Sequence, residues 1–235
     1  AQKAESRRLW SLTGTACLAG GIWAMHFIGM LAFQAPVEIH YALPITLASL
    51  LIALLASWLV MLTLSQAQQT LWRYVRASVC IGLGIAGMHY VGMGAMRSEA
   101  AAYFEPTLFT LSVLIAMLAG LAALLIARQL RGGMGLPHQL KKYTASLVLG
   151  AGLFSMHFTG MAAFNMVLPA GSALTPPGEN DHLQLGLTVA VMTLLIIGSS
   201  ISAALADKKL QHKEHDLQRV NALLSHLDQA RMSLQ

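Results

Sequence analysis

The chain has 235 residues, of which 56% are hydrophobic and 11% are charged, with a mean hydropathy of +0.60 and a net charge of +5. A soluble domain of this size alternates apolar with polar positions along its elements, and this sequence hardly does. The composition therefore excludes an ordinary soluble protein and predicts an all-α, polytopic bundle of transmembrane helices.

Six apolar stretches are long enough for the ~20-residue helix that crosses a bilayer. We predict spans at residues 9–33, 43–65, 75–96, 107–128, 143–166 and 184–206. The first is not a cleavable signal peptide, because the apolar pattern and the motifs described below continue directly from it. Residues 1–8 form a short basic segment in front of the bundle, which we expect to span 9–206.

Basic residues occupy every second connection between the spans. They are Arg7, Arg8, Arg73, Arg76, Arg128, Arg131, Lys141, Lys142, Lys208, Lys209 and Lys213. The other loops, 34–42, 97–106 and 167–183, hold a single basic residue, Arg97, beside several acidic ones. By the positive-inside rule we expect both ends of the chain in the cytoplasm and the protein in the bacterial inner membrane. The positive charge thus reflects topology and does not indicate nucleic-acid binding.

One six-residue motif occurs three times, once in the first, third and fifth spans. The copies are Met25-His26-Phe27-Ile28-Gly29-Met30, Met88-His89-Tyr90-Val91-Gly92-Met93 and Met156-His157-Phe158-Thr159-Gly160-Met161. Such self-similarity indicates three repeated two-span units, 9–65, 75–128 and 143–206. Because the three motif spans run in the same direction, we expect the histidines at one depth near the periplasmic face, with the glycines allowing the helices to approach closely.

The residue types of the motif predict a metal site. In each copy the histidine and the second methionine are four residues apart, on one face of a helix. Imidazole suits several transition metals, thioether selects soft ions such as Cu(I), and no carboxylate within the spans is available for a harder ion. We therefore expect a copper ion held by members of one ligand set. That set is His26, His89, His157, Met30, Met93, Met161, Met25, Met88 and Met156.

The alternative is that these side chains only fill the core, since a lone membrane histidine or methionine usually packs. Three copies in one register favour the metal site over packing. Phe27, Tyr90 and Phe158 are expected to pack rather than bind, although Tyr90 could hydrogen-bond behind a ligand. Cys17 and Cys80 are interpreted as small buried fillers, and His40 and His182 as loop residues that could assist metal access.

Residues 207–235 change abruptly to a charged and polar composition. Leu210, Leu217 and Leu224 recur every seven residues, which predicts a coiled-coil-like linker helix that continues the sixth span and supports a homodimer. A solvated amphipathic tail is the alternative. The linker would lead to an output domain that is not in this sequence.

The motifs resemble the MHYT domain, a bacterial integral-membrane sensor module named for a Met-His-Tyr-Thr signature, over residues 9–206. The resemblance implies copper binding through the listed histidines and methionines. It also implies sensing of oxygen, carbon monoxide or nitric oxide, and fusion to GGDEF or EAL domains that make or degrade cyclic di-GMP. Family members usually have seven spans, so the resemblance implies an N-terminal truncation here. Thr occurs only at Thr159 and Tyr only at Tyr90.

The preferred function is a metal-dependent sensor of a diatomic gas or redox signal, with no catalytic residue in this chain. Three alternatives share the same histidines. They could hold a catalytic zinc in a membrane hydrolase, ligate haem, or pass copper across the membrane. The absence of an intramembrane carboxylate counts against the hydrolase, and ligands at one depth count against transport.

Overall fold

The computed structural model describes residues 2–35, 37–66, 70–129, 136–169 and 183–232. It divides into two compact units, Ala1–Ile196 and Ile197–Gln235. The first unit holds the membrane bundle, and the second is the remainder of the last helix and the chain end. Each unit is described by itself.

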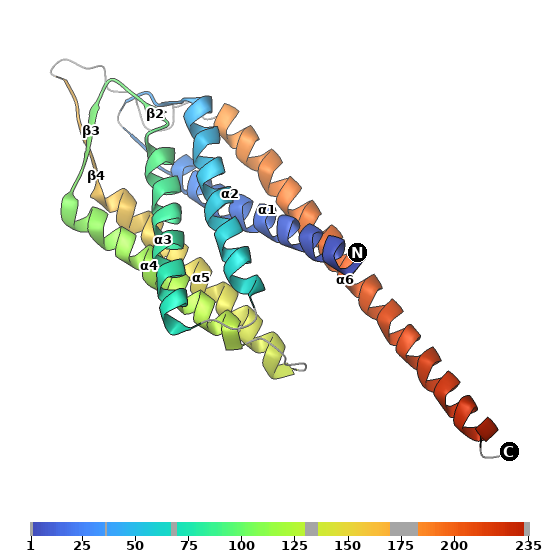
Figure 1. Ribbon diagram of the computed structural model, residues 1–235. Helices are drawn as coiled ribbons and strands as arrows, with labels where there is room; N and C mark the ends of the chain where they lie inside the picture. The colour runs from blue at the N-terminus through green and yellow to red at the C-terminus, as the bar shows by residue number, and fades with distance from the viewer. Residues whose placement is uncertain (1, 36, 67–69, 130–135, 170–182, 233–235) are drawn as a thin grey trace. The chain divides into compact units, whose positions relative to one another are not determined.

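The described part of the chain folds into six long helices, as Figure 1 shows. They are α1 (Gln2–Leu31), α2 (Leu43–Ser65), α3 (Leu71–Met93), α4 (Pro106–Gln129), α5 (Leu136–Ala163) and α6 (Leu183–Met232). Each contains an apolar stretch of at least 18 residues, which confirms the six predicted spans and the all-α polytopic bundle. The third span begins and ends a few residues earlier than predicted, because Met96–Arg97 form a strand.

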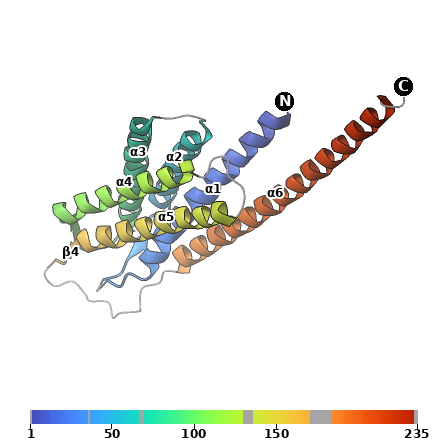
Figure 2. The same cartoon turned by 90° about the horizontal axis from the view of Figure 1, so that it is seen from below.

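Helices that follow one another in sequence pack side by side from α1 to α5. Figures 1 and 2 both show α4 and α5 lying along each other. The motif helices α1, α3 and α5 also contact one another. This arrangement fits repeated two-helix units whose first helices meet.

Small residues let motif helices approach their neighbours. A Cβ built on Gly84 of α3 would lie 2.7 Å from the Ala56 side chain of α2. Gly152 of α5 makes the corresponding close approach to Ala119 of α4. Such contacts bring helix backbones together where lipid offers no hydrophobic driving force.

Within the described residues, four short strands that the sequence analysis did not predict connect the loops at one end of the bundle. They are β1 (His40–Tyr41), β2 (Met96–Arg97), β3 (Ala101–Phe104) and β4 (Phe164–Val167). Antiparallel pairs β1–β2 and β3–β4 link the loop after α1 to the loop after α3, and that loop to the segment after α5. The described residues of the three connections predicted to share one side of the membrane therefore lie at the same end of the bundle.

The same loops form a small hydrophobic cluster of their own. Ala35, Val37 and Ile39 are buried there, and Met96 and Met166 pack against them. The chain after α1 thus contributes apolar side chains that contact the strands from the other two repeats.

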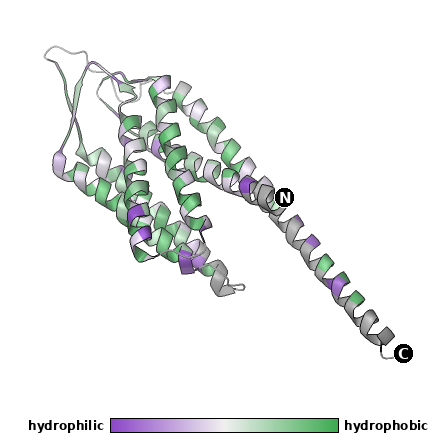
Figure 3. Cartoon of the chain, viewed as in Figure 1, coloured by the Kyte–Doolittle hydropathy of each residue, from purple (hydrophilic) through white to green (hydrophobic). Residues whose placement is uncertain are grey.

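Exposed leucines mark lipid-facing positions on α2 and α4. Leu51 and Leu55 of α2 are 61% and 70% exposed, and Leu118 of α4 is 65% exposed. Figure 3 shows that α2 and α4 are mostly hydrophobic in colour. An exposed leucine face is what a bilayer solvates, so the chain is a multi-pass membrane protein.

The cysteine prediction is partly wrong. Neither cysteine forms a disulfide, but Cys17 is half-buried and Cys80 is exposed. Cys80 lies on the helix face turned away from the histidines, and that face of α3 is not covered by another described helix.

The tail predicted as helical is helical to Met232, because α6 runs without interruption from Leu183. Within the second unit, Leu217, Val220 and Leu224 are more than half exposed. Exposed apolar residues at these positions are compatible with a coiled-coil seam, and dimerisation remains a prediction.

Candidate metal centre

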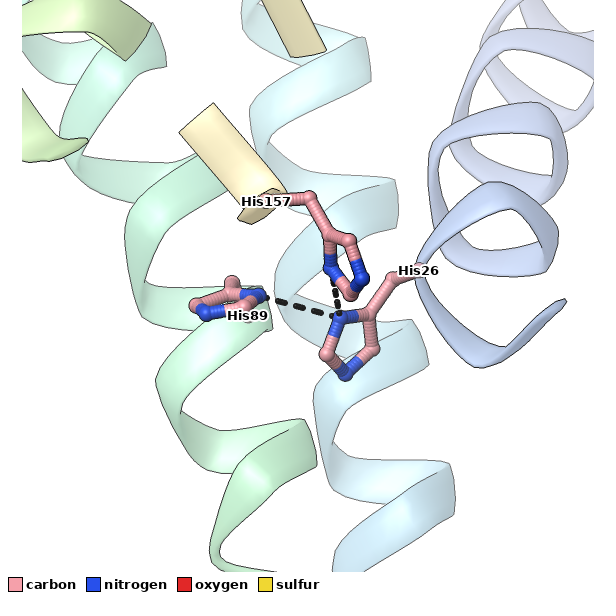
Figure 4. Close-up of side chains that lie close together, drawn as sticks. All are labelled: His26, His89 and His157. Atoms are coloured by element: carbon pink, nitrogen blue, oxygen red, sulfur yellow. Dashed lines mark hydrogen bonds between the residues drawn. The ribbon is translucent and has the colours of Figure 1, made fainter. Parts of the chain in front are cut away.

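The three motif histidines meet inside the bundle. His26 comes from α1, His89 from α3 and His157 from α5, and each side chain is at most 1% exposed. Figure 4 shows the three rings turned toward one another from three different helices. The prediction that the histidines share one depth is therefore confirmed.

Their Nδ1 atoms converge. The Nδ1 of His26 lies 3.0 Å from the Nδ1 of His89 and 3.2 Å from the Nδ1 of His157. The ring centroids are 4.8 to 5.2 Å apart and the ring planes are close to perpendicular, at 77° to 89°. Edge-on rings of this kind direct one nitrogen from each side chain at a common point.

Hydrogen bonds among the three imidazoles cannot satisfy all of their Nδ1 atoms. A neutral imidazole nitrogen carries either one proton or one lone pair. The Nδ1 of His26 faces two other nitrogens, so only one of its two contacts can be a full hydrogen bond. A cation would accept all three lone pairs at once. Three nitrogens bound to one zinc at ~2.0–2.1 Å lie about 3.3–3.6 Å apart, close to the observed spacing.

The Nε2 atoms point away from the cluster, and each lies against a motif glycine of another repeat. A Cβ on Gly92 would collide with the Nε2 of His26, one on Gly160 with that of His89, and one on Gly29 with that of His157. All three Nε2 atoms are buried without a hydrogen-bond partner among the described residues. If Nδ1 carries the lone pair, the proton is on Nε2, in the space that the glycine leaves.

Two of the three repeats match a known protein family. A family model described as "MHYT: Bacterial signalling protein N terminal repeat" matches residues 20–77 and 82–136. The chain belongs to the MHYT family. The matched ranges include His26 and His89. The third motif, with His157, lies outside them, but the structure places His157 beside the other two histidines.

The chain is also similar to curated bacterial proteins. It is 46% identical over 97% of its length to the cyclic di-GMP phosphodiesterase NbdA of Pseudomonas aeruginosa. It is 37% identical over 86% of its length to the bifunctional diguanylate cyclase/cyclic di-GMP phosphodiesterase MucR of the same species. A signalling protein of Bacillus subtilis, YkoW, is 29% identical over 93% of this chain. The chain is thus a membrane sensor domain of the signalling class.

This MHYT chain spans 29% of the length of NbdA and 29% of the length of MucR. The enzymatic names belong to those longer proteins. No solved structure matches the chain significantly.

The six MHYT methionines belong to the hydrophobic core of the bundle or pack against it. Met30, Met88, Met93 and Met156 are buried, and Met25 and Met161 are half-buried against the same cluster. The structure therefore brings the whole predicted ligand set into one region, with the histidine nitrogens in mutual contact. Ligation by any methionine sulfur remains a prediction.

Each MHYT histidine also contacts the aromatic ring that follows it. Phe27, Tyr90 and Phe158 lie edge-on to their own histidines at 4.7, 4.8 and 5.1 Å between centroids. The hydroxyl of Tyr90 lies 2.6 Å from the Ser112 hydroxyl of α4. Phe27 packs in the core as expected, whereas Phe158 is 49% exposed. Tyr90 directs its polar atom at a neighbouring helix rather than at the histidine cluster.

Acidic side chains are not part of the site. Among the residues that the structure describes, the three histidines are the one group of three potential histidine, cysteine or carboxylate ligands that lie close enough to hold an ion. His40 is exposed and pairs with Glu38 at 3.3 Å, in the loop before α2. His182 lies outside the described residues.

Sequence reasoning missed the specific role of the motif glycines. It predicted that they allow close helix approach, whereas Gly29, Gly92 and Gly160 each face the imidazole of a different repeat. The signal was the fixed spacing of three residues between histidine and glycine in every copy.

Proposed function

We propose that this chain is a copper-dependent membrane sensor whose ion is held by the Nδ1 atoms of His26, His89 and His157. The convergence of those three buried nitrogens carries the proposal. No two of the histidines belong to the same helix, so a shared ion would join the three repeats.

The donor set favours copper. Three imidazoles suit copper and zinc alike, but thioether sulfur selects soft ions such as Cu(I). Met30, Met93 and Met161 follow their histidines by one helical turn and lie in the same core. Carboxylates, which hard cations require, are absent from the described group of ligands.

The proposed signal is a diatomic gas (oxygen, carbon monoxide or nitric oxide) or a redox change. Copper would supply a redox-active centre that binds such ligands. The chain's own contribution is to hold three nitrogens in a dry core and to connect them to α1, α3 and α5. A signal acts only if it favours one packing of these helices over another.

The proposed output is synthesis or breakdown of cyclic di-GMP by a further domain. Two relatives carry names of such enzymes. The helix α6 begins with Leu185 and Val189 in the bundle core and continues to Met232. We propose that this continuous helix passes the signal on, within a homodimer formed through its polar segment.

The proposed location is the bacterial inner membrane with both ends of the chain in the cytoplasm. The basic residues Arg8, Arg73, Arg128 and Lys141 lie at the ends of helices opposite the strand-linked loops. The positive-inside rule then places the strands and the nearby histidines on the periplasmic side.

Metal content by mass spectrometry on detergent-purified protein tests the proposal. The parent should hold about one copper per chain after reconstitution with Cu(I), and His26→Ala, His89→Ala and His157→Ala should each lose it. His40→Ala is the matched control, because His40 is an exposed histidine at the same end of the bundle. It should bind copper as the parent does.

Two results would contradict the proposal. Copper retained in all three histidine variants would place the ion elsewhere, and a parent without copper would leave the histidines as packing. Zinc is the second candidate, because the spacing of three nitrogens equally fits its tetrahedral sites. Stoichiometric zinc in place of copper, with hydrolysis lost in His157→Ala, would establish that reading instead.

A further inference from the structure

The three histidines and three glycines of the motifs form a closed cycle. The Nε2 of His26 lies against Gly92, that of His89 against Gly160, and that of His157 against Gly29. Each repeat therefore offers its imidazole to the next repeat and receives one from the repeat before. The direction is the same at all three contacts.

We propose that Gly29, Gly92 and Gly160 are positioning residues that hold the imidazole of the adjacent repeat so that the three Nδ1 atoms converge. We call each of these three contacts a glycine seat. The proposal deepens the proposed function, on which its metal measurement rests. Its stability measurement does not depend on a metal.

The contact geometry explains why glycine is needed. On Gly160 the three atoms nearest to an added Cβ all belong to the imidazole of His89, with Nε2 the nearest and Cδ2 at 3.0 Å. A methyl group there must displace either the ring or a helix. The imidazole is the movable partner, because the atom in the way is the far end of a side chain.

Displacing Nε2 also moves Nδ1, because both nitrogens belong to one rigid ring. The Nδ1 of His26 lies 3.0 Å from that of His89 and 3.2 Å from that of His157, so a shift of a few tenths of an ångström changes these distances appreciably. The glycine seat thus sets the position of Nδ1, the proposed ligand atom, through its contact with Nε2 on the opposite edge of the ring. Residues that orient a metal ligand in this way typically change metal affinity about 10- to 100-fold when replaced.

The chain provides matched control glycines on the same three helices. A Cβ on Gly21 of α1 or Gly150 of α5 would meet nothing within 4 Å, and one on Gly87 of α3 would make an ordinary 3.7 Å contact with Ile52. Alanine is the better helix former, so substitution at these open positions should leave stability unchanged or raise it.

The first experiment compares Cu(I) affinity, measured by competition with a coloured chelator, in the three seat variants and the three controls. Gly29→Ala, Gly92→Ala and Gly160→Ala should each bind about 10- to 100-fold more weakly than the parent. Gly21→Ala, Gly87→Ala and Gly150→Ala should stay within about twofold of it. Equal affinity in seat and control variants would overturn the proposal.

The second experiment tests the pairing in metal-free protein by thermal unfolding in detergent. Gly160→Ala should lower the melting temperature of the parent and of His26→Ala, where the His89 ring still occupies the seat. In His89→Ala the ring is gone, and Gly160→Ala should leave the melting temperature unchanged or raise it. The same loss in both histidine backgrounds would contradict the directed cycle.

The two experiments separate this inference from the proposed function. A parent that binds no copper but shows the pairing would refute the copper sensor and support the seats. A parent that binds copper, with seat variants that bind equally well, would support the sensor and refute the seats. If Gly160→Ala does not fold, Gly92→Ala makes the same test, with its effect expected in the parent and in His89→Ala and absent in His26→Ala, which lacks the ring that occupies that seat.

Discussion

The motif helices and their partner helices differ in apolar character although all of them span the membrane. The spans in α1, α3 and α5 have mean hydropathies of 1.4, 1.2 and 1.3, whereas those in α2, α4 and α6 have 2.4, 2.6 and 2.0. The less hydrophobic helix of every unit carries the histidine. Hydropathy thus alternates along the chain between the helices that carry the histidines and their more apolar partner helices.

The difference follows from what each helix contacts. Motif helices make glycine and histidine contacts with one another, and these residues lower the mean hydropathy. Partner helices present leucine to the bilayer, which needs no specific contact. Since lipid and leucine are equally apolar, the bundle is held by close packing and hydrogen bonds between helices. We therefore expect substitutions on motif helices to cost more than the same substitutions on partner helices.

The largest difference between the two classes of helix is expected at two tryptophans. Trp23 of α1 is fully buried, and its Nε1 donates a hydrogen bond to the Ser49 hydroxyl of α2 at 3.1 Å, whereas Trp58 of α2 is 40% exposed. Trp23→Ala should lower the free energy of unfolding by about 3–5 kcal/mol, because it leaves a cavity. Trp58→Ala should cost about 1 kcal/mol or less.

Reversible unfolding in detergent, followed by tryptophan fluorescence of the remaining residues, measures both losses. Equal losses would show that the two classes of helix are packed alike, and the comparison would fail. Trp23→Phe refines the result, because it keeps most of the volume and removes the hydrogen bond.

A smaller effect is expected where a motif helix bonds to its partner helix through hydroxyl groups. Ser112 of α4 donates to the Phe109 carbonyl at 2.7 Å, which leaves its oxygen to accept the proton of Tyr90 in α3. Tyr90→Phe should cost about 1 kcal/mol. Ser112→Ala should cost somewhat more, about 1–3 kcal/mol, because the half-buried phenol loses its acceptor.

Thermal unfolding of the two single variants and the double variant measures this coupling. The double variant should be no less stable than Ser112→Ala alone, since both changes remove the same bond. Fully additive losses would show that the two hydroxyl groups do not interact.

Much of this arrangement could be predicted from the sequence. Hydropathy alone placed six spans, because lipid requires about 20 apolar residues per helix and leaves little freedom. Three copies of one motif placed His26, His89 and His157 at one depth, because equivalent residues on helices running in the same direction must share a level. Both predictions rest on strict geometrical constraints.

Other features depend on contacts that no local pattern encodes. The strands around His40 and Phe164 pair loops far apart in the sequence, and two- to four-residue strands have too few positions for a periodic signal. The burial of Cys80 was predicted wrongly, because the face of a helix that lies against lipid is as apolar as one inside the bundle. The pairing of each histidine with one particular glycine needed the three helices in place.

The smallest effect is expected at Glu105, where a partner helix begins and its first residues meet a motif helix. The backbone N–H groups of Leu108 and Thr107 donate to the Glu105 carboxylate at 2.7 and 3.0 Å, and these bonds hold its pKa below the ordinary value. The Glu105 N–H donates to the Ala163 carbonyl at the end of α5. The charged carboxylate therefore caps α4 at its contact with α5.

A carboxylate whose pKa is lower in the folded than in the unfolded protein stabilises the fold above the unfolded pKa. That stability is lost as the pH falls through the folded pKa. Glu105→Gln should therefore lower the melting temperature near pH 7 and converge with the parent in acid. Glu99→Gln removes an exposed charge from the same loop and is the matched control, which should leave the melting temperature near pH 7 closer to that of the parent. Parallel melting curves for the parent and Glu105→Gln from pH 7 to pH 3 would mean that the cap contributes nothing to the contact between α4 and α5, and that packing alone joins the two classes of helix there.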